Sequence, residues 1–238
     1  MTILAVDTSS QAASCALWQD GVLAGEFFCN VGLTHSQTAM PMVEALLHIT
    51  GVALSDVDLL AVTTGPGSFT GLRIGIASVK GMAMALDKPC AGVSTLEALA
   101  AGVPGFEGYV APVMDARRSQ VYTALFRSHN GVRERLSPDQ ALSVAELGKI
   151  LAPLDGPVML VGDGSVLCYQ ALKDLPNLRL APEGCRHQRA GWVAAVAAGM
   201  AEQKKLISAE QLAPAYLRLP QAERERMERE QQAKLRQQ

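Results

Sequence analysis

The hydrophobic pattern is densest over residues 58–86, where it predicts a buried strand that leads directly into a long helix. The strand ends at the glycine turn Gly65-Pro66-Gly67, and from about residue 71 onward apolar side chains recur at helical spacing. Either Ser68 or Thr70 is suited to cap the helix by accepting a backbone N–H. One stripe of the helix fits against a sheet, and it contains Leu72, Ile76, Val79, Ala83 and Leu86.

A second apolar stripe follows the opposite side of this helix, where the surface helix of a monomer is normally polar. The helix predicted at residues 34–50 has the same property, because its apolar arc is too wide for a single packing surface. Thr34 is its expected cap, and Gly51 follows its end. Both helices are therefore expected to need contacts on two sides. The predicted partner interface consists of Ala39, Met42, Leu46, Ile49, Ile74, Ala77, Gly81 and Met84.

The pattern of strands and turns occurs twice along the chain. Asp20-Gly21 joins two strands in the first half, and His129-Asn130-Gly131 joins two in the second, and both are hairpin signals. The predicted strands are residues 2–6, 12–19, 22–29, 59–63, 90–93, 109–114, 119–126, 132–136 and 158–161. The predicted helices are residues 34–50, 71–86, 94–101, 143–151, 165–173 and 190–203.

This duplication predicts an α/β protein with two lobes. The Gly- and Pro-containing break at residues 101–105 is the expected boundary. We assign residues 1–103 to the first lobe with the partner-binding helices, residues 104–220 to the second lobe, and residues 221–238 to a charged tail. Residues 214–218, with the sequence PAYLR, are expected to dock on the body as an extended segment.

Composition narrows the classes of function. The 238 residues are 49% hydrophobic and 18% charged, so the chain has enough apolar surface for a substantial core. A net charge of −2 does not favour a stand-alone nucleic-acid binder, which usually carries a basic face. Five scattered cysteines without a C-x-x-C pair indicate a reducing, cytoplasmic location. The sequence predicts neither a signal peptide nor a membrane span.

Two stretches raise the question of nucleotide binding. The turn Gly65-Pro66-Gly67 precedes a helix whose N-terminus could accept phosphate, but it matches neither the Walker loop nor the dinucleotide fingerprint. Asp7-Thr8-Ser9 closes the first strand before a hairpin, as at the start of actin-like and sugar-kinase-like folds, where such an Asp lies near phosphates and metal. The alternative, that these three side chains only satisfy turn backbone groups, has equal weight. Gly162-Asp163-Gly164-Ser165 is more simply a turn and cap, and His35 and His48 are more simply packing residues than ligands.

Four motifs together resemble the TsaB family, also called YeaZ. They are VDTSSQAASCAL, THSQTAMPMVEALL, TTGPGSFTGLRIGIASVKGMAMAL and PVMDARRSQVYTALF, and they cover most of residues 1–126. The resemblance implies a two-lobed actin-like (ASKHA, ribonuclease-H-like) fold. It also implies a role in making threonylcarbamoyladenosine at position 37 of tRNAs that read codons beginning with A.

The resemblance further implies a relative of the catalytic subunit TsaD without its active site. Thr95 and Leu99 stand where that subunit has its pair of metal-binding histidines, and Met114-Asp115-Ala116 stands where it has Ser-Gly-Gly. Neither a leucine nor a threonine is a useful ligand for iron or zinc. No catalytic residue, metal or cofactor is therefore expected. The residues Asp7, Thr8, Ser9 and Asp115 are candidates for a vestigial nucleotide site.

The partners that the resemblance implies are a TsaD-like catalytic subunit in a heterodimer, a small TsaE-like ATPase at that heterodimer, and tRNA through the complex. For the chain alone, a homodimer and a monomer both stay open. Two alternatives stay open. One is a degenerate nucleotide-binding ATPase or protease-like enzyme of the same superfamily. The other is a tRNA-binding module that uses Arg117-Arg118 and Arg133 with Arg135.

Overall fold

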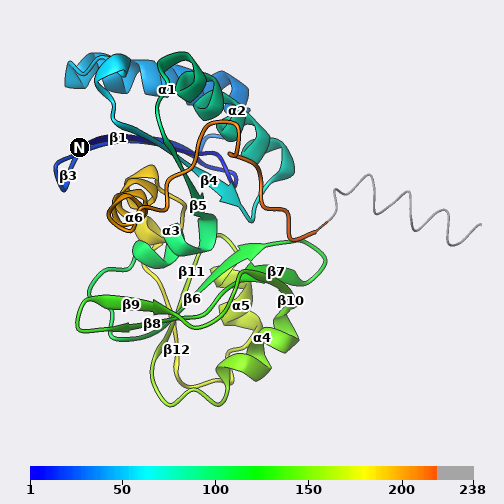
Figure 1. Ribbon diagram of the computed structural model, residues 1–238. Helices are drawn as coiled ribbons and strands as arrows, with labels where there is room; N and C mark the ends of the chain where they lie inside the picture. Colours follow the sequence, from blue (N-terminus) through cyan, green and yellow to red (C-terminus); the bar gives the residue numbers. More distant parts are fainter. Residues whose placement is uncertain (219–238) are drawn as a thin grey trace, which may run out of the picture.

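A computed structural model describes residues 1–218 as two lobes, each built on a mixed sheet (Figure 1). The sheet of the first lobe has the order β3-β2-β1-β4-β5. Its central strand runs antiparallel to β2 and parallel to β4, so an antiparallel hairpin precedes parallel crossover units. The strands are β1 (Thr2–Asp7), β2 (Ala13–Gln19), β3 (Val22–Cys29), β4 (Leu59–Gly65) and β5 (Cys90–Ser94).

The sheet of the second lobe repeats this order as β10-β7-β6-β11-β12, with the same relative directions. The strands are β6 (Gly108–Asp115), β7 (Gln120–Thr123), β10 (Gln140–Ser143), β11 (Val158–Val161) and β12 (Leu178–Leu180). A hairpin of β8 (Phe126–His129) and β9 (Val132–Arg135) pairs with the start of β6, without a counterpart in the first lobe. The repeated order confirms the two-lobed actin-like, ribonuclease-H-like fold.

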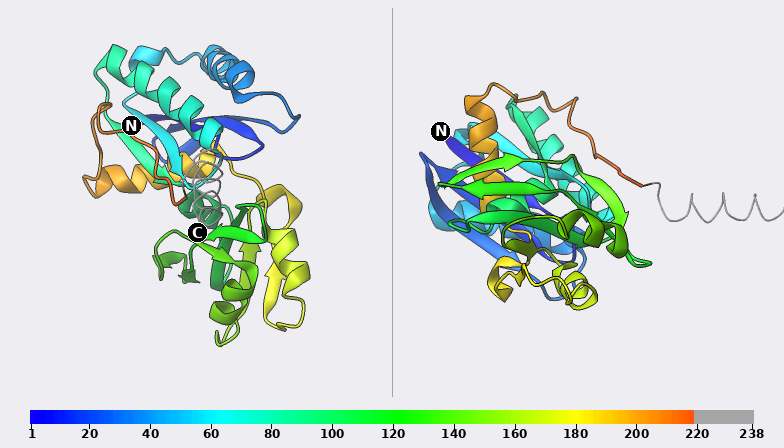
Figure 2. Two further views of the ribbon diagram at one scale, coloured as in Figure 1. Left: turned by 90° about the vertical axis from the view of Figure 1, so that its right-hand side faces the viewer. Right: turned by 90° about the horizontal axis from the view of Figure 1, so that it is seen from below.

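Each lobe carries two helices on one face of its sheet, and Figure 2 shows them from two further sides. In the first lobe these are α1 (His35–Thr50) and α2 (Phe69–Leu86), and in the second α4 (Val144–Leu151) and α5 (Ser165–Ala171). Ser68 caps α2 as one of two expected residues, because its hydroxyl accepts from the Gly71 N–H at 3.2 Å. By length and composition α2 is the one helix of residues 1–218 that could cross a membrane, but 39% of it is buried in the fold, and a helix packed on a sheet passes the same test.

The two remaining α-helices join the lobes. α3 (Thr95–Ala101) follows β5 but packs Leu96 and Leu99 into the core of the second lobe, beside Val110 of β6. α6 (Ala190–Glu202) follows the second lobe but packs Val193 and Ala197 under the first sheet. The predicted division is therefore corrected: residues 190–218 pack with the first lobe, not with 104–189. Two 3-10 turns, Leu54–Asp56 and Glu183–Cys185, complete the described elements.

The segment after α6 returns along the first lobe as an extended strap of residues 205–218 (orange in Figure 1). Ile207 exchanges two backbone hydrogen bonds with Cys90, and the Ala215 N–H donates to the Thr64 carbonyl at 2.7 Å. The Tyr216 ring stacks on Phe69 with centroids 4.7 Å apart. The predicted docking of residues 214–218 is confirmed, whereas the predicted tail at 221–238 lies outside the described residues.

Candidate functional site

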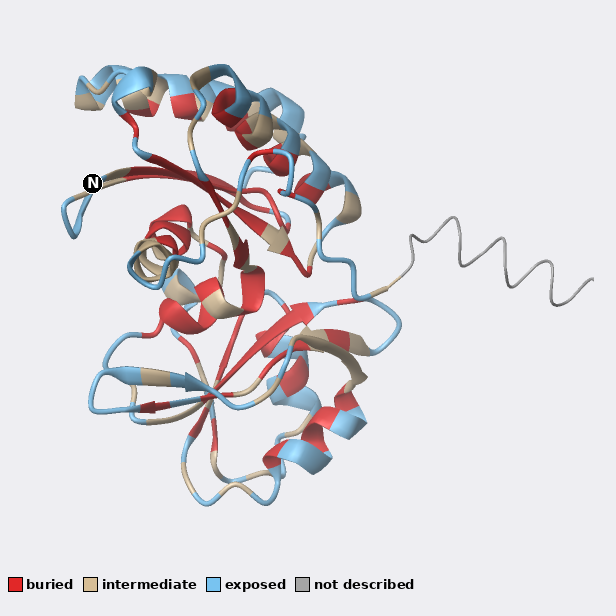
Figure 3. Cartoon of the chain, viewed as in Figure 1, coloured by how far each residue is buried: buried red, intermediate tan, exposed pale blue. Residues whose placement is uncertain are grey.

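The outer side of α1 and α2 is largely exposed (pale blue in Figure 3), and several of its exposed residues are apolar. Ile49 is 71% exposed and Met84 58% exposed, and Ala77 and Gly81 of α2 also lie in solvent. Met42 and Ile74 are half-buried at the edge of this surface. These six residues lie where the sequence predicted a partner interface, and we refer to them as the outer face: Met42, Ile49, Ile74, Ala77, Gly81 and Met84.

Two residues predicted in that interface lie in the core instead. Ala39 is 4% exposed and Leu46 1% exposed, because α1 turns them toward the first sheet together with Val43. These three residues are spaced i, i+4, i+7 and so form one helical stripe within the wide apolar arc that the sequence showed. Neither Ala39 nor Leu46 is available to a partner.

The glycines of α2 have two different surroundings. A Cβ at Gly71 would overlap the Thr8 carbonyl oxygen, and one at Gly75 would overlap the Thr8 hydroxyl, so both positions need glycine for packing inside the chain. A Cβ at Gly81 would have no neighbour within 4 Å. A glycine within a helix costs about 1 kcal/mol relative to alanine. Within residues 1–218, no packing contact requires glycine at position 81.

The turn after β1 is packed tightly against the start of α2. The Ser9 carbonyl accepts from the Ser68 N–H at 2.7 Å, and the Thr8 hydroxyl donates to the Gly71 carbonyl at 2.8 Å. Asp7 accepts from both the N–H and the hydroxyl of Ser9, each at 2.8 Å. The three residues that could have held phosphate or metal therefore satisfy backbone and turn groups, so the contacts favour the structural alternative.

Asp7 is fully buried, and burial raises the pKa of its carboxyl, against the opposing effect of the Ser9 hydrogen bonds. Its Oδ2 has no hydrogen-bond partner among the described residues, and neither has Thr63 Oγ1. Sequence reasoning weighed Asp7 as a phosphate or metal neighbour. Because burial raises the free-energy cost of ionising this carboxyl, it is less suited to bind a cation than an exposed one.

The corresponding turn of the second lobe, after β6, is open to solvent. Asp115 is exposed, its Oδ1 accepts from the Arg117 N–H at 2.7 Å, and its own N–H donates to Asp163 Oδ1 at 3.1 Å. Both turns line a cleft of about 740 Å³ between the lobes. The strap closes one side of it, where Arg218 donates to the Ala116 carbonyl at 2.8 Å. The sequence did not predict that Asp163 would join Asp115 there, because residues 115 and 163 meet only through the pairing of β6 with β11.

Thr95 and Leu99, at which the sequence resemblance predicts the loss of a metal site, lie inside the protein. Thr95 is buried, and Leu99 belongs to the core of the second lobe. Within residues 1–218 no group of three or more His, Cys, Asp or Glu side chains is arranged to hold a metal ion. His35 is a packing residue, since its Nε2 lies 2.7 Å from the Ser10 carbonyl oxygen.

These features define the class: a two-lobed actin-like protein with tightly packed first-lobe turns and an apolar outer face. The family model of TsaD, tRNA N6-adenosine threonylcarbamoyltransferase, matches residues 31–225. The chain is 36% identical over 225 residues to tRNA threonylcarbamoyladenosine biosynthesis protein TsaB of Bacillus subtilis, covering 94% of this chain and 96% of the relative. TsaB of Escherichia coli is 35% identical, covering 92% and 95%. The structure of YeaZ from Pseudomonas aeruginosa superposes with a TM-score of 0.76 at 31% identity, covering 91% and 99%. The chain belongs to the TsaB (YeaZ) family.

Proposed function

We propose that this protein is a non-catalytic subunit that pairs with a TsaD-like catalytic subunit through the outer face of α1 and α2. Family membership makes it a protein of tRNA threonylcarbamoyladenosine biosynthesis, and the specific scaffold role is our inference. Gly81 is the observation that carries it, because an exposed helical glycine without an internal neighbour fits the close approach of a second helix. Exposed Met84 and Ile49 would supply apolar area around that crossing.

A non-catalytic role is supported by the residues at the positions where the resemblance implies metal and nucleotide binding in TsaD. Leu99 fills a core instead of binding metal, and the first-lobe turns leave no space between Ser9 and Ser68 for a phosphate. The test is turnover and metal content of the isolated protein. We expect no appreciable ATP hydrolysis and no retained iron or zinc. ATP turnover, or stoichiometric metal that survives chelation and gel filtration, would favour the ATPase or protease-like alternative instead.

The other partners in this proposal act through the heterodimer. A small TsaE-like ATPase would bind at the heterodimer, tRNA reading codons that begin with A would be modified at position 37 by the complex, and the isolated chain would form a homodimer through the same outer face. The work would take place in the cytoplasm. Direct tRNA binding receives less support, because Arg135 is already paired with Glu97 at 3.0 Å and with Asp139 at 2.6 Å.

Ala77→Arg tests the pairing surface. Ala77 is exposed, and arginine is a good helix former, so the isolated fold should survive. In a tight helix crossing, the same arginine would have to bury an unpaired charge or hold the helices apart. We therefore expect pairing with the TsaD-like subunit to weaken by at least 100-fold, which corresponds to about 2.7 kcal/mol. Pull-down and calorimetric titration measure the pairing, and circular dichroism with thermal melting measures the fold.

Val166→Arg is the matched control. Val166 is a similarly exposed apolar residue of α5, the counterpart of α2 in the second lobe. Its replacement should leave pairing unchanged. If Ala77→Arg pairs as well as the parent, the proposed surface is wrong, and if both variants lose pairing, the partner covers the second lobe as well.

A further inference from the structure

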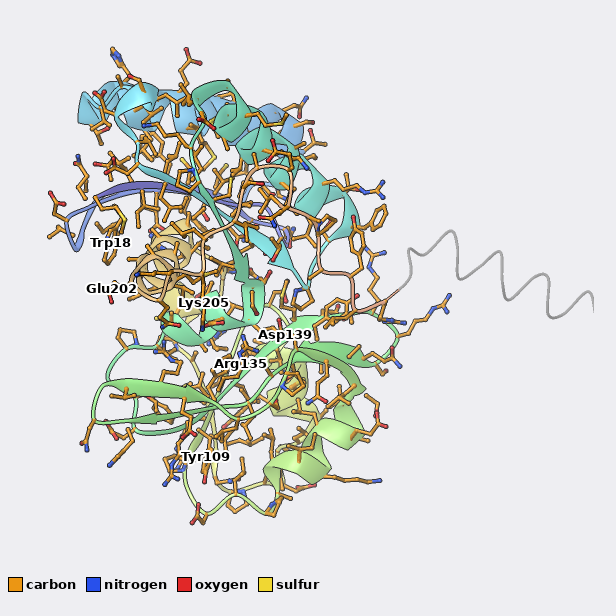
Figure 4. The ribbon with its side chains drawn as sticks, in the orientation of Figure 1. Trp18, Tyr109, Arg135, Asp139, Glu202 and Lys205 are labelled. Carbon is orange, nitrogen blue, oxygen red and sulfur yellow. The ribbon has the colours of Figure 1, made fainter. Side chains whose placement is uncertain are left out.

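A second pocket lies between the lobes, on the other side of the strap from the cleft described above. Its volume is about 660 Å³, within the range of sites that hold small molecules. Ala215 borders both pockets, and its hydrogen bond to Thr64 fixes the strap where it divides them. The walls of the second pocket come from the ends of β4 and β5, from α3, α6 and β9, and from the strap. Two of its lining residues, Asp139 and Lys205, are labelled in Figure 4.

One side of α6 forms the apolar floor of this pocket. The opposite side of α6 packs Val193 and Ala197 under the first sheet, so the floor is the side that a surface helix would normally make polar. A Cβ at Gly199 would have no neighbour within 4 Å, so Gly199 leaves open space on the floor of the pocket. The floor residues are Trp192, Ala195, Val196, Gly199 and Met200.

Three hydrogen-bond donors of the pocket are unused, whereas the carboxylates at the pocket are occupied. Arg133 Nε is buried without a hydrogen-bond acceptor among the described residues, and within residues 1–218 neither the Lys205 ammonium nor the Trp192 indole N–H has a hydrogen bond or an ion pair. Glu97 accepts from Arg135, and Asp139 accepts from Arg135 and, at 2.6 Å, from the Ser94 hydroxyl. A ligand that supplies acceptors would therefore complete this pocket.

The local charge also favours an anion. Arg133, Arg135 and Lys205 bring three positive charges near the pocket, and Glu97 and Asp139 bring two negative charges. Burial lowers the pKa of the Arg133 guanidinium, and the nearby Glu97 carboxylate only partly offsets this without bonding to it. A bound anion would compensate a half-buried cation that the protein itself leaves without an acceptor.

We propose that this pocket binds a mononucleotide, with its flat heteroaromatic ring on the α6 floor beside Trp192 and its phosphate at Arg133 and Lys205. The apolar side of α6 with the Trp192 indole suits an aromatic ring, and the two basic side chains suit a compact anion. The volume is larger than a free phosphate or a single amino acid needs. This inference is independent of the pairing surface, because the pocket and the outer face share no residue.

The test uses the full chain and fluorescence of Trp192. The chain has only two tryptophans, so Trp18→Phe leaves Trp192 as the single reporter. We expect AMP to quench its emission and to show saturable heat in calorimetric titration. Adenosine, which lacks the anion, should bind at least tenfold more weakly, and inorganic phosphate, which lacks the ring, should not quench.

Variants locate the site. Arg133→Gln and Lys205→Gln, the latter at an exposed position, should each weaken AMP binding about tenfold or more. Arg127→Gln removes the same charge from the same β8–β9 hairpin outside the pocket and should leave binding unchanged. The proposal is overturned if AMP fails to bind, if adenosine binds equally well, or if binding is insensitive to both pocket variants, since the last result would place the nucleotide in the other cleft.

Discussion

The helix layers of the two lobes occupy equivalent positions on sheets of the same strand order, yet they differ in length and surface. α1 and α2 have 16 and 18 residues, whereas α4 and α5 have 8 and 7. Both layers expose some apolar side chains, including Val166 on α5 and Met84 on α2. Only the first-lobe layer carries a helical glycine without an internal neighbour. The duplicated frame thus serves folding in both lobes, and the first lobe has extra helix surface that its own sheet does not use.

The turns that precede α2 and α5 show a second difference. In both lobes a glycine of this turn lies close to the central strand. Gly67 lies against the carbonyl of Ser9, just beyond the end of β1, and Gly162 lies against the carbonyl of Val113, near the end of β6. In the first lobe the close approach continues along α2, because Gly71 and Gly75 both lie against Thr8. The corresponding helix α5 begins with Ser165 and contains no glycine. The first lobe therefore has a tight seam between the β1–β2 turn and α2, and the second lobe has only a local contact.

The largest expected effect comes from breaking this seam with Gly71→Ala. The new Cβ would overlap the Thr8 carbonyl, which is backbone and cannot rotate away, and the Thr8–Gly71 hydrogen bond would be disturbed. We expect a loss of about 3 kcal/mol or more in the free energy of unfolding, measured by urea denaturation.

Gly164→Ala in the second lobe is the comparison variant. Its Cβ would lie 3.0 Å from the Asp115 backbone nitrogen, a milder conflict, so the expected loss is about 1 kcal/mol. Equal losses in the two variants would show that the seam is not special to the first lobe.

Much of this frame could be predicted from the sequence because it depends on local periodicity. The β11 bounds, both hairpin turns, the α2 core stripe and the docked end of the strap at residues 214–218 all follow from patterns within a few residues of one another. Two short strands were missed: β10, with the sequence QALS, and β12 have too few apolar residues to show alternation. The strand predicted at 119–126 is divided into β7 and β8 by Ala124-Leu125.

The rest depends on contacts that no local pattern contains. α6 is apolar on all sides, so its sequence says that it is covered but not which lobe covers it. The buried side of α1 was ambiguous for a similar reason, and only the packing of the helix on β2 and β3 decides that Leu46 faces inward. Thr34 precedes α1 as expected, but its hydroxyl bonds Gln37 Oε1 instead of capping a backbone N–H. The pocket beside Trp192 combines residues from across the chain, so no local sequence pattern indicated it.

A smaller effect on stability is expected at the aspartates that end β1 and β6, because Asp7 is buried and Asp115 is exposed. In Asp7→Asn, the amide oxygen keeps the hydrogen bonds from Ser9, and the amide N–H can reach the unpaired Thr63 hydroxyl oxygen. The folded-state pKa of Asp7 is raised, so the parent protein loses stability as the pH rises from the unfolded pKa of about 4 through the folded pKa. The variant has no such loss.

The stability gain of Asp7→Asn should therefore be small at pH 4 and grow to a plateau at higher pH. It amounts to about 1.4 kcal/mol for each tenfold difference in proton affinity between the folded and unfolded states. Thermal and urea unfolding from pH 4 to 8 measure it. Asp115→Asn, at the exposed equivalent turn, controls for the loss of one negative charge. A gain that is the same at every pH would contradict the buried, neutral-favouring carboxyl.

The smallest expected effect concerns Gly81, and its two readouts should change in opposite directions. Because a Cβ there meets nothing within the chain, Gly81→Ala should stabilise the isolated protein by up to about 1 kcal/mol through helix propensity. If a partner helix crosses at this position, the same methyl group separates the two backbones and should weaken pairing about tenfold. Gly199→Ala, at the other helical glycine with open space, should stabilise the fold similarly and leave pairing unchanged. The gain in helix propensity does not depend on a partner, so only the pairing measurement reports on the crossing. If the isolated protein is stabilised and pairing is not weakened, the partner helix does not cross at Gly81 and contacts another part of the outer face.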